Sequence, residues 1–254
     1  RSFDRLGVDG RIVITDIDPL APTASVADEV YLVPRLTDPA YVPTLLEICK
    51  RERIDLLFPL IDPDIPVLAA HTAEFAALGT SCAVVSPEAA EITSDKWLTN
   101  SFFERIGAPT ARSWLPSEMD GDVGFPLFIK PRRGSAGQHS YKVTNADELA
   151  FFSRYVPDPI DQEFLPGPEI TVDVTCDLDG EVLAIVCRRR IEVRSGEVSK
   201  GVTVHRADII DWSGRVARDL KAIGPITVQC MLDGDSPRFT EINPRFGGGV
   251  PLGI

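Results

Sequence analysis

Three oxygen-bearing side chains near the end of the chain have the types and the spacing to bind a metal ion. Glu241 and Asn243 are two residues apart in a strand-like pattern, so they should point to one face, together with Phe239. An alternating run upstream holds Gln229, and residues 233–237 between the two runs supply turn chemistry. A turn that is symmetric about its middle residue places Gln229 directly across from Glu241. The three side chains would then suit a hard cation such as Mg²⁺ that phosphate oxygens also hold.

Arg245 lies just beyond this hairpin and supplies a fixed positive charge. Its fork of N–H donors fits phosphoryl or carboxylate oxygens. An edge hairpin whose polar face is only hydrated explains the same residues equally well, because exposed Glu and Asn need no functional explanation. The residues alone therefore leave both interpretations open.

The run Glu-Ile-Asn-Pro-Arg-Phe-Gly-Gly-Gly at 241–249, after a strand that carries Gln229, resembles the metal-binding signature of the ATP-grasp superfamily. It is most similar to the large subunit of carbamoyl phosphate synthase and to stand-alone ligases that join carboxylates and amines. The resemblance implies that Glu241 and Asn243 hold Mg²⁺ on the phosphates of ATP, with Mn²⁺ as the alternative metal. It also implies that Arg245 meets the phosphoryl group or the acyl substrate. Many members have an acid in place of Gln229, so metal binding should be weak without phosphates.

A second candidate for nucleotide binding is Lys130, which ends the apolar run 125–129. A lysine at the end of such a strand is costly unless it meets an anion. The segment 132–140, with Ser135 and Gly137, combines small, basic and hydroxyl residues, as a phosphate-covering flap does. The resemblance implies that Lys130 contacts the α- and β-phosphates while this loop closes over them. A P-loop is excluded because the pattern Gly-x-x-x-x-Gly-Lys-Ser is absent, and a mobile loop without a ligand is the alternative.

Lys96 opens a predicted helix, with Ser94 as the expected N-cap residue. Members of the ATP-grasp superfamily carry a basic residue at the start of this helix, where it reaches the nucleotide phosphates. A lysine on a hydrated surface explains the same position without a ligand.

Between residues 162 and 174 a strand breaks at Pro166-Gly167 and then resumes. Backbone groups in such a crossing can read the edge of an adenine, and a carboxylate there can accept from ribose hydroxyls. By resemblance, the nucleotide would be bound by Glu163, Phe164, Leu165 and Glu169. A kink without any ligand fits the local sequence equally well.

Two strands expected at 181–193 and 198–205 carry further basic residues. The resemblance makes Lys200 and Arg190 candidates for contact with the γ-phosphate or the acyl substrate. Solvated charges on a strand face are the alternative.

Composition limits the partners and the compartment. Lys and Arg number 26 against 38 Asp and Glu, a net charge of −12, which argues against nucleic acid or an anionic membrane as the main partner. The cysteines are odd in number and lack the Cys-x-x-Cys spacing, so we expect a reduced, cytoplasmic protein without structural zinc. No apolar run approaches the length of a membrane span, and no signal peptide is expected.

The chain should form an α/β fold in three parts. Strands and helices alternate up to about residue 90, which predicts a parallel sheet. By resemblance, residues 1–90 are a Rossmann-like pre-ATP-grasp domain without its first strand, 91–161 the first ATP-grasp subdomain and 162–254 the second, both with antiparallel sheets. Asp16, Asp18, Asp62 and Asp64 follow predicted strand ends, where α/β sheets place ligand contacts, but ordinary turns use the same residues.

The expected function is that of an ATP- and Mg²⁺-dependent ligase. Such an enzyme activates a carboxylate or bicarbonate as an acyl phosphate, which an amine or another nucleophile attacks. The partners are then small carboxylate and amine substrates, with a homodimer as an open expectation. The alternatives are an ATP-binding sensor or regulatory module without turnover, and a non-catalytic assembly subunit.

Overall fold

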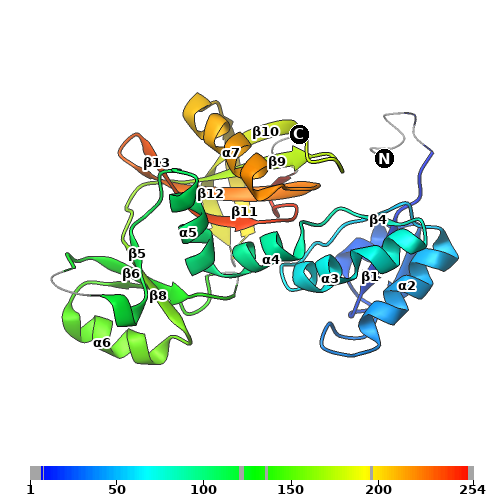
Figure 1. Ribbon diagram of the computed structural model, residues 1–254, viewed down its shortest axis with the longest axis horizontal. Coiled ribbons are helices and arrows are strands. Elements are labelled where there is room, and N and C mark those ends of the chain that lie inside the picture. Colours follow the sequence, from blue (N-terminus) through cyan, green and yellow to red (C-terminus); the bar gives the residue numbers. More distant parts are fainter. Residues whose placement is uncertain (1–6, 8, 120–122, 135–136, 195–196, 251–254) are drawn as a thin grey trace. The chain divides into compact units, whose positions relative to one another are not determined.

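The computed structural model describes residues 7, 9–119, 123–134, 137–194 and 197–250 (Figure 1). Contacts divide the chain into two compact units, residues 1–57 with 71–82 and residues 58–70 with 83–254. The three-part division expected from the resemblance is finer than this and stays a prediction. Within the described part of the chain, every helix is too short or too polar to span a lipid bilayer.

The first unit is built around short parallel strands. One pair joins β1 (Val13–Asp16) to β2 (Glu29–Leu32), and another joins β3 (Leu56–Leu57) to β4 (Ser81–Cys82). In the sequence, η1 (Pro22–Ser25) lies between β1 and β2, and α2 (Tyr41–Glu52) lies between β2 and β3. Helix α3 (Asp64–Ala77), between β3 and β4, contributes residues to both units. Helix α2 buries Tyr41, Leu45, Ile48 and Cys49, which lie on one helical face. The parallel pairing predicted for this part of the sequence is confirmed.

The second unit contains a four-stranded antiparallel sheet in the order β5-β8-β6-β7. Its strands are β5 (Ser113–Trp114), β6 (Leu127–Pro131), β7 (Tyr141–Val143) and β8 (Pro159–Glu163), with η2 (Pro116–Glu118) after β5. Leu127, Ile129 and Val143 form an apolar cluster with Val156, which follows α6 (Ala146–Tyr155). Because strand residues alternate, Lys130 and Gln162 lie on the opposite face from this cluster.

The same unit contains a five-stranded antiparallel sheet in the order β11-β10-β9-β12-β13 (Figure 1). Its strands are β9 (Glu169–Cys176), β10 (Val182–Arg194), β11 (Glu197–Val204), β12 (Pro225–Asp233) and β13 (Ser236–Asn243). Helices α4 (Pro87–Ser94), α5 (Lys96–Arg105) and α7 (Ala207–Leu220) pack against it. On β9, Ile170, Val172 and Val174 are buried, whereas Glu169 and Asp173 are only partly buried. One face of the sheet therefore belongs to the core, and polar side chains lie on the other.

The start of α5 differs from the prediction. Ser94 ends α4, and the N-cap of α5 is Asp95, whose Oδ1 accepts from the backbone N–H of Trp97 at 2.9 Å. Both residue types cap helices well. Asp95 takes the position because α4 occupies the preceding residues.

Candidate nucleotide and metal site

The hairpin of β12 and β13 brings two of the predicted metal ligands face to face. Gln229 pairs directly with Glu241, as predicted, and Thr227 pairs with Asn243. The turn itself is Gly234-Asp235, and Gly234 has a φ of 59°, which suits a residue without Cβ. The predicted pairing therefore arises from a bulge rather than from a symmetric turn.

Because of this bulge, Phe239 lies on the face of β13 opposite to the one predicted. Cys230 pairs with Phe239 while its neighbour Gln229 pairs with Glu241, so Thr240 is an extra residue on β13. An extra residue reverses the alternation of side chains beyond it. Phe239 and Ile242 are accordingly both fully buried, and Phe239 packs on Phe103 of α5. Phe239 lies in the core and not beside Glu241.

A row of directly paired residues runs from the hairpin across the polar face of the sheet. It links Glu241 to Gln229, then Thr171 on β9 and Arg188 on β10. Gln229 Nε2 donates to Glu169 Oε1 at 2.9 Å, which leaves the amide oxygen of Gln229 as its acceptor atom. Glu169, predicted to bind ribose, thus lies beside the predicted metal ligands.

Arg190 and Lys200, the two candidates for contact with the γ-phosphate or the acyl substrate, lie on β10 and β11. Arg190 Nη1 donates to the same Glu169 oxygen at 2.8 Å, so it is close to the row. Lys200 is on β11, at the opposite edge of the sheet from β13, and its side chain is 68% exposed. It pairs with Glu192 at 2.7 Å. The structure does not bring Lys200 together with the hairpin.

Lys130 is buried at the end of β6, where its side chain points away from the apolar cluster. It is 7% exposed, and its Nζ donates to Gln162 Oε1 at 3.2 Å. Burial lowers the pKa of Lys130 to about 8; the carboxylate of Glu241 opposes this shift, and the ammonium group of Lys96 adds to it. The charges of Glu241 on β13 and of Lys96 on α5 are therefore both close enough to act on Lys130.

Lys96 is held at the start of α5 against the loop that follows β6. Its Nζ donates to the carbonyl of Gly134 at 2.7 Å, and its backbone N–H donates to the carbonyl of Arg132 at 2.9 Å. Gly134 has a φ of 122° and Gly137 a φ of 65°, conformations that favour glycine. Ser135, predicted to belong to this flap, lies outside the described residues.

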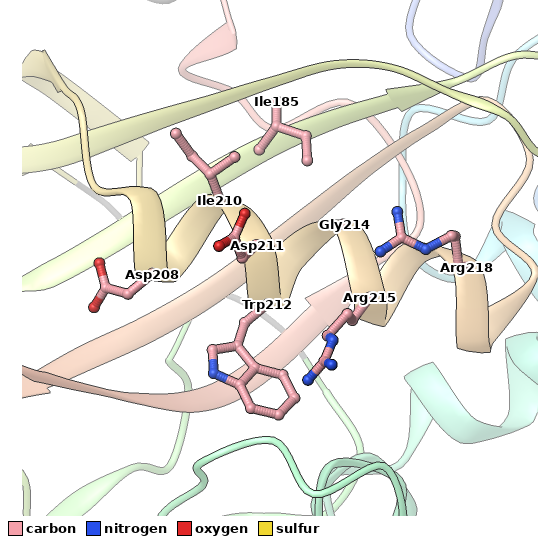
Figure 2. A pocket seen from close by; sticks show the side chains of 8 residues that line it. All are labelled: Ile185, Asp208, Ile210, Asp211, Trp212, Gly214, Arg215 and Arg218. Atoms are coloured by element: carbon pink, nitrogen blue, oxygen red, sulfur yellow. The ribbon is translucent and has the colours of Figure 1, made fainter.

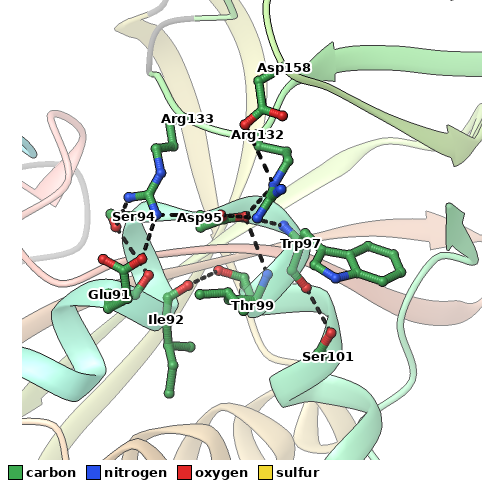
Figure 3. A network of polar contacts seen from close by, with 11 residues as sticks. Glu91, Ile92, Ser94, Asp95, Trp97, Thr99, Ser101, Arg132, Arg133 and Asp158 are labelled. Atoms are coloured by element: carbon green, nitrogen blue, oxygen red, sulfur yellow. Dashed lines mark hydrogen bonds and ion pairs between the residues drawn. The ribbon is translucent and has the colours of Figure 1, made fainter. Parts of the chain in front are cut away.

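A network of polar contacts fastens this loop to the helix (Figure 3). The carboxylate of Asp95, which is 1% exposed, accepts from Arg132 Nη2 at 2.6 Å and from Arg132 Nε at 3.2 Å. Arg133 donates to Ser94 Oγ at 2.9 Å. Asp95 therefore does two things at once, because it caps the helix that carries Lys96 and binds the first arginine of the loop. Sequence reasoning missed this role.

The crossing between β8 and β9 is held at several points. Glu163 Oε1 accepts from the backbone N–H of Arg112 at 2.9 Å, and Lys142 Nζ lies 4.3 Å from the ring centre of Phe164. Leu165 follows directly. Gly167 lies so close to the carbonyl of Leu232 that a Cβ atom would clash with it. The predicted adenine-binding residues thus lie on a fixed crossing segment.

Arg245 makes a bidentate ion pair with Asp62. Its Nε and Nη2 donate to Asp62 Oδ1 and Oδ2, each at 2.7 Å. Among the four acids at predicted strand ends, Asp16 and Asp18 instead accept from backbone N–H groups within their own turn. Asp62 also lies in a turn, before α3, but its side chain binds Arg245 instead of a backbone group of that turn.

The donor set fits a metal ion that is shared with phosphate. Among the described residues, no three His, Cys, Asp or Glu side chains gather as a metal site would require. The hairpin offers one carboxylate, from Glu241, and the carboxamide oxygens of Gln229 and Asn243. Oxygen donors suit Mg²⁺, which binds through one or two carboxylates plus substrate phosphates. A cation held by protein groups alone would need more negative charge.

A pocket of about 590 Å³ lies elsewhere, along α7 (Figure 2). It is lined by Ile185 of β10 and by α7 residues that include Asp208, Trp212 and Arg215. None of the predicted site residues lines it. It is therefore not part of the candidate site.

Two parts of the chain match known protein families. Residues 2–83 match a family described as PylC-like, N-terminal domain, and residues 156–254 match one described as ATP-grasp in the biosynthetic pathway with Ter operon. The chain is 27% identical to a formate-dependent phosphoribosylglycinamide formyltransferase of Mycolicibacterium vanbaalenii, over 96% of this chain and 65% of that protein. It is 25% identical to a carbamoyl-phosphate synthase of Methanobrevibacter smithii, over 64% of this chain and 45% of that protein.

A solved structure of similar fold is the biotin carboxylase of Campylobacter jejuni in complex with β,γ-ATP. It aligns with a TM-score of 0.78 at 17% identity, over 100% of this chain and 63% of the carboxylase. The chain thus spans less than two thirds of the length of these relatives. Residues 156–254, in the second half of the chain, thus match an ATP-grasp family, and the chain is similar in sequence to a carbamoyl-phosphate synthase.

Proposed function

We propose that this chain is the nucleotide-binding part of an ATP- and Mg²⁺-dependent ligase that converts a carboxylate into an acyl phosphate for attack by an amine. The observation that carries the proposal is the direct pairing of Gln229 with Glu241. Glu241 is also close enough to the buried Lys130 to affect the pKa of that lysine. A buried lysine beside oxygen donors for a hard cation is the arrangement expected around a metal-bound polyphosphate.

In this function the basic residues bind and orient the nucleotide. Lys130 and Lys96 would lie against the phosphates, where they offset the negative charge that shifts toward the leaving group. A bound Mg²⁺, held by Glu241 with Asn243 and Gln229, would neutralise phosphate charge and stabilise the transfer. Arg245 would bind an oxygen of the transferred phosphoryl group. The reaction needs no nucleophilic side chain, because the substrate carboxylate attacks the γ-phosphorus of ATP and displaces ADP, and the amine then attacks the acyl carbon and displaces phosphate.

The names of the relatives support the substrate class. One relative is named for a formate-dependent formyl transfer to phosphoribosylglycinamide, and formate is a carboxylate. Another is named for carbamoyl phosphate, an acyl phosphate. Small carboxylate and amine substrates are therefore proposed for this chain, and a homodimer stays a prediction. The net charge of −12 argues against nucleic acid as a partner.

The proposal is tested by replacing Glu241 in the full-length protein. ADP release is measured with Mg-ATP and a panel of amino acids, small carboxylates and bicarbonate. Glu241→Gln should lower turnover by about 100-fold or more, because the metal loses its only carboxylate in the hairpin. Asp235→Asn serves as the control, since it removes a carboxylate from the exposed turn of the same hairpin. Unchanged turnover in Glu241→Gln would remove the metal assignment, and ATP binding without turnover in the wild type would favour the sensor instead.

A further inference from the structure

Arg245 is bound by a carboxylate that comes from a distant part of the sequence. Its Nε and Nη2 donate to the two oxygens of Asp62 at 2.7 Å each, and its Nη1 donates to the carbonyl of Phe246 at 3.0 Å. The side chains of Arg245 and Asp62 are only 20% and 28% exposed. A bidentate, charge-assisted pair of this kind fixes the plane of the guanidinium group.

The backbone around Arg245 is held as well. Its carbonyl accepts from Thr227 Oγ1 at 3.0 Å, and its N–H donates to the carbonyl of Asn243 at 2.8 Å. The ring of Phe246 packs on the ring of Phe58, with centroids 5.5 Å apart. The segment 58–62 therefore contacts Arg245 through an ion pair and its neighbour Phe246 through a ring contact.

We infer that Asp62 is a positioning residue for Arg245, a role that rests on the proposed ligase function. A guanidinium group has five N–H donors, and the contacts described above use three of them. After these contacts with described residues, one donor on Nη1 and one on Nη2 remain for an oxygen of the phosphoryl group or the acyl substrate. Asp62 also offsets the charge of Arg245, which lowers the repulsion between this arginine and a bound Mg²⁺.

The alternative is that the pair only stabilises the fold. A structural role predicts that losing Asp62 lowers the melting temperature without altering turnover by the protein that stays folded. A positioning role predicts a change in kcat, because a misplaced arginine stabilises the transferred phosphoryl group less well. The KM for ATP should change little, since Lys130, Lys96 and the metal ligands are intact.

The experiment compares Asp62→Ala, Asp62→Asn and Asp62→Glu in the full-length protein, with Asp235→Asn as the control for lost charge on an exposed turn. Asp62→Ala should lower kcat by about 10- to 100-fold while KM for ATP stays within about twofold. Asp62→Asn should lose most of the same activity, because an amide cannot accept both arginine N–H groups. Asp62→Glu should recover part of it. An unchanged kcat in Asp62→Ala overturns the inference.

A second measurement does not depend on turnover. Melting temperatures are compared for Asp62→Ala, Arg245→Ala and the double variant. If Asp62 holds Arg245, the loss in the double variant is smaller than the two single losses added together. Additive losses overturn the inference. If the proposed function is wrong, neither the wild type nor Asp235→Asn releases ADP. In that case the melting temperatures alone decide whether Asp62 holds the arginine.

Discussion

A carboxyl group is buried on the apolar side of the four-stranded sheet. Asp161 on β8 is 1% exposed, and neither of its oxygens has a hydrogen-bond partner among the described residues. It pairs directly with Ile129 of the apolar cluster and with Trp114, which packs against that cluster. Burial raises the pKa of Asp161 to about 6. The proposed nucleotide chemistry does not use this residue.

This raised pKa predicts how stability depends on pH. In the unfolded chain the pKa of Asp is about 3.9, so between about pH 4 and pH 6 the folded protein holds the proton more tightly. Stability therefore falls as the pH rises through this window, and above about pH 6 the ionised Asp161 costs about 3 kcal/mol. Asp161→Val should raise the free energy of unfolding in urea, and the gain should be larger at pH 8 than at pH 4. A gain that is equal at the two pH values contradicts the prediction, and Asp235→Val provides the exposed control.

At the level of single elements, Asp95 joins the start of α5 to the loop after β6. Burial would raise the pKa of Asp95, but hydrogen bonds from Arg132 and from the N–H of Trp97 outweigh it and hold the pKa below its usual value. A lowered carboxylate pKa contributes stability that is present above the unfolded pKa of about 3.9 and is lost as the pH falls through the folded value. The contact between helix and loop should therefore weaken below about pH 4.

Two substitutions separate the cap from the ion pair. Asn caps a helix about as well as Asp, so Asp95→Asn should keep the cap of α5 and lose only the charge that faces Arg132. Asp95→Ala loses both and should be less stable than Asp95→Asn by about 1 kcal/mol at pH 7. Urea unfolding of both variants checks the order. If Asp95→Ala and Asp95→Asn are equally stable, the cap contributes nothing to stability. If Asp95→Asn is as stable as the wild type, the ion pair with Arg132 contributes nothing.

The local features of these elements could be predicted, and their long-range contacts could not. The parallel strands of the first unit follow from the alternation of strand and helix patterns. Gln229 pairs with Glu241 as predicted, but the bulge on β13 produces this pairing and not the symmetric turn on which the prediction was based. The bulge at Thr240 could not be predicted, because one extra residue leaves no pattern in the sequence. The pair of Asp62 and Arg245 joins residues 183 positions apart, and either side chain alone looks like a residue of a turn or a hydrated surface.

On the scale of the whole molecule, a strongly acidic chain gathers positive charge on one face of its larger sheet. The net charge is −12, yet Arg188 and Arg190 lie on the polar face with Gln229 and Glu241, and Lys130 is near enough for Glu241 to affect its pKa. Arg188 is 1% exposed and paired with Asp173, so its charge is offset locally. The acidic surplus elsewhere does not oppose a nucleotide here, because exposed charges beyond about 10 Å are screened by salt.

Binding of Mg-ATP should therefore stabilise the folded chain, and the stabilisation should depend on Lys130. At a free concentration of 100 times Kd, a ligand that binds only the folded state adds about 2.7 kcal/mol, which for a chain of this size raises Tm by about 5–10 °C. Excess chelator should remove much of this rise, because in the proposed site Glu241 and two carboxamides would hold the metal only together with phosphate. Lys130→Met should reduce the rise, whereas Lys50→Met removes an equal charge from the exposed side of α2 and should leave it unchanged. Differential scanning fluorimetry measures all four conditions, and an equal rise in Lys130→Met and Lys50→Met would show that the nucleotide does not bind at the buried lysine.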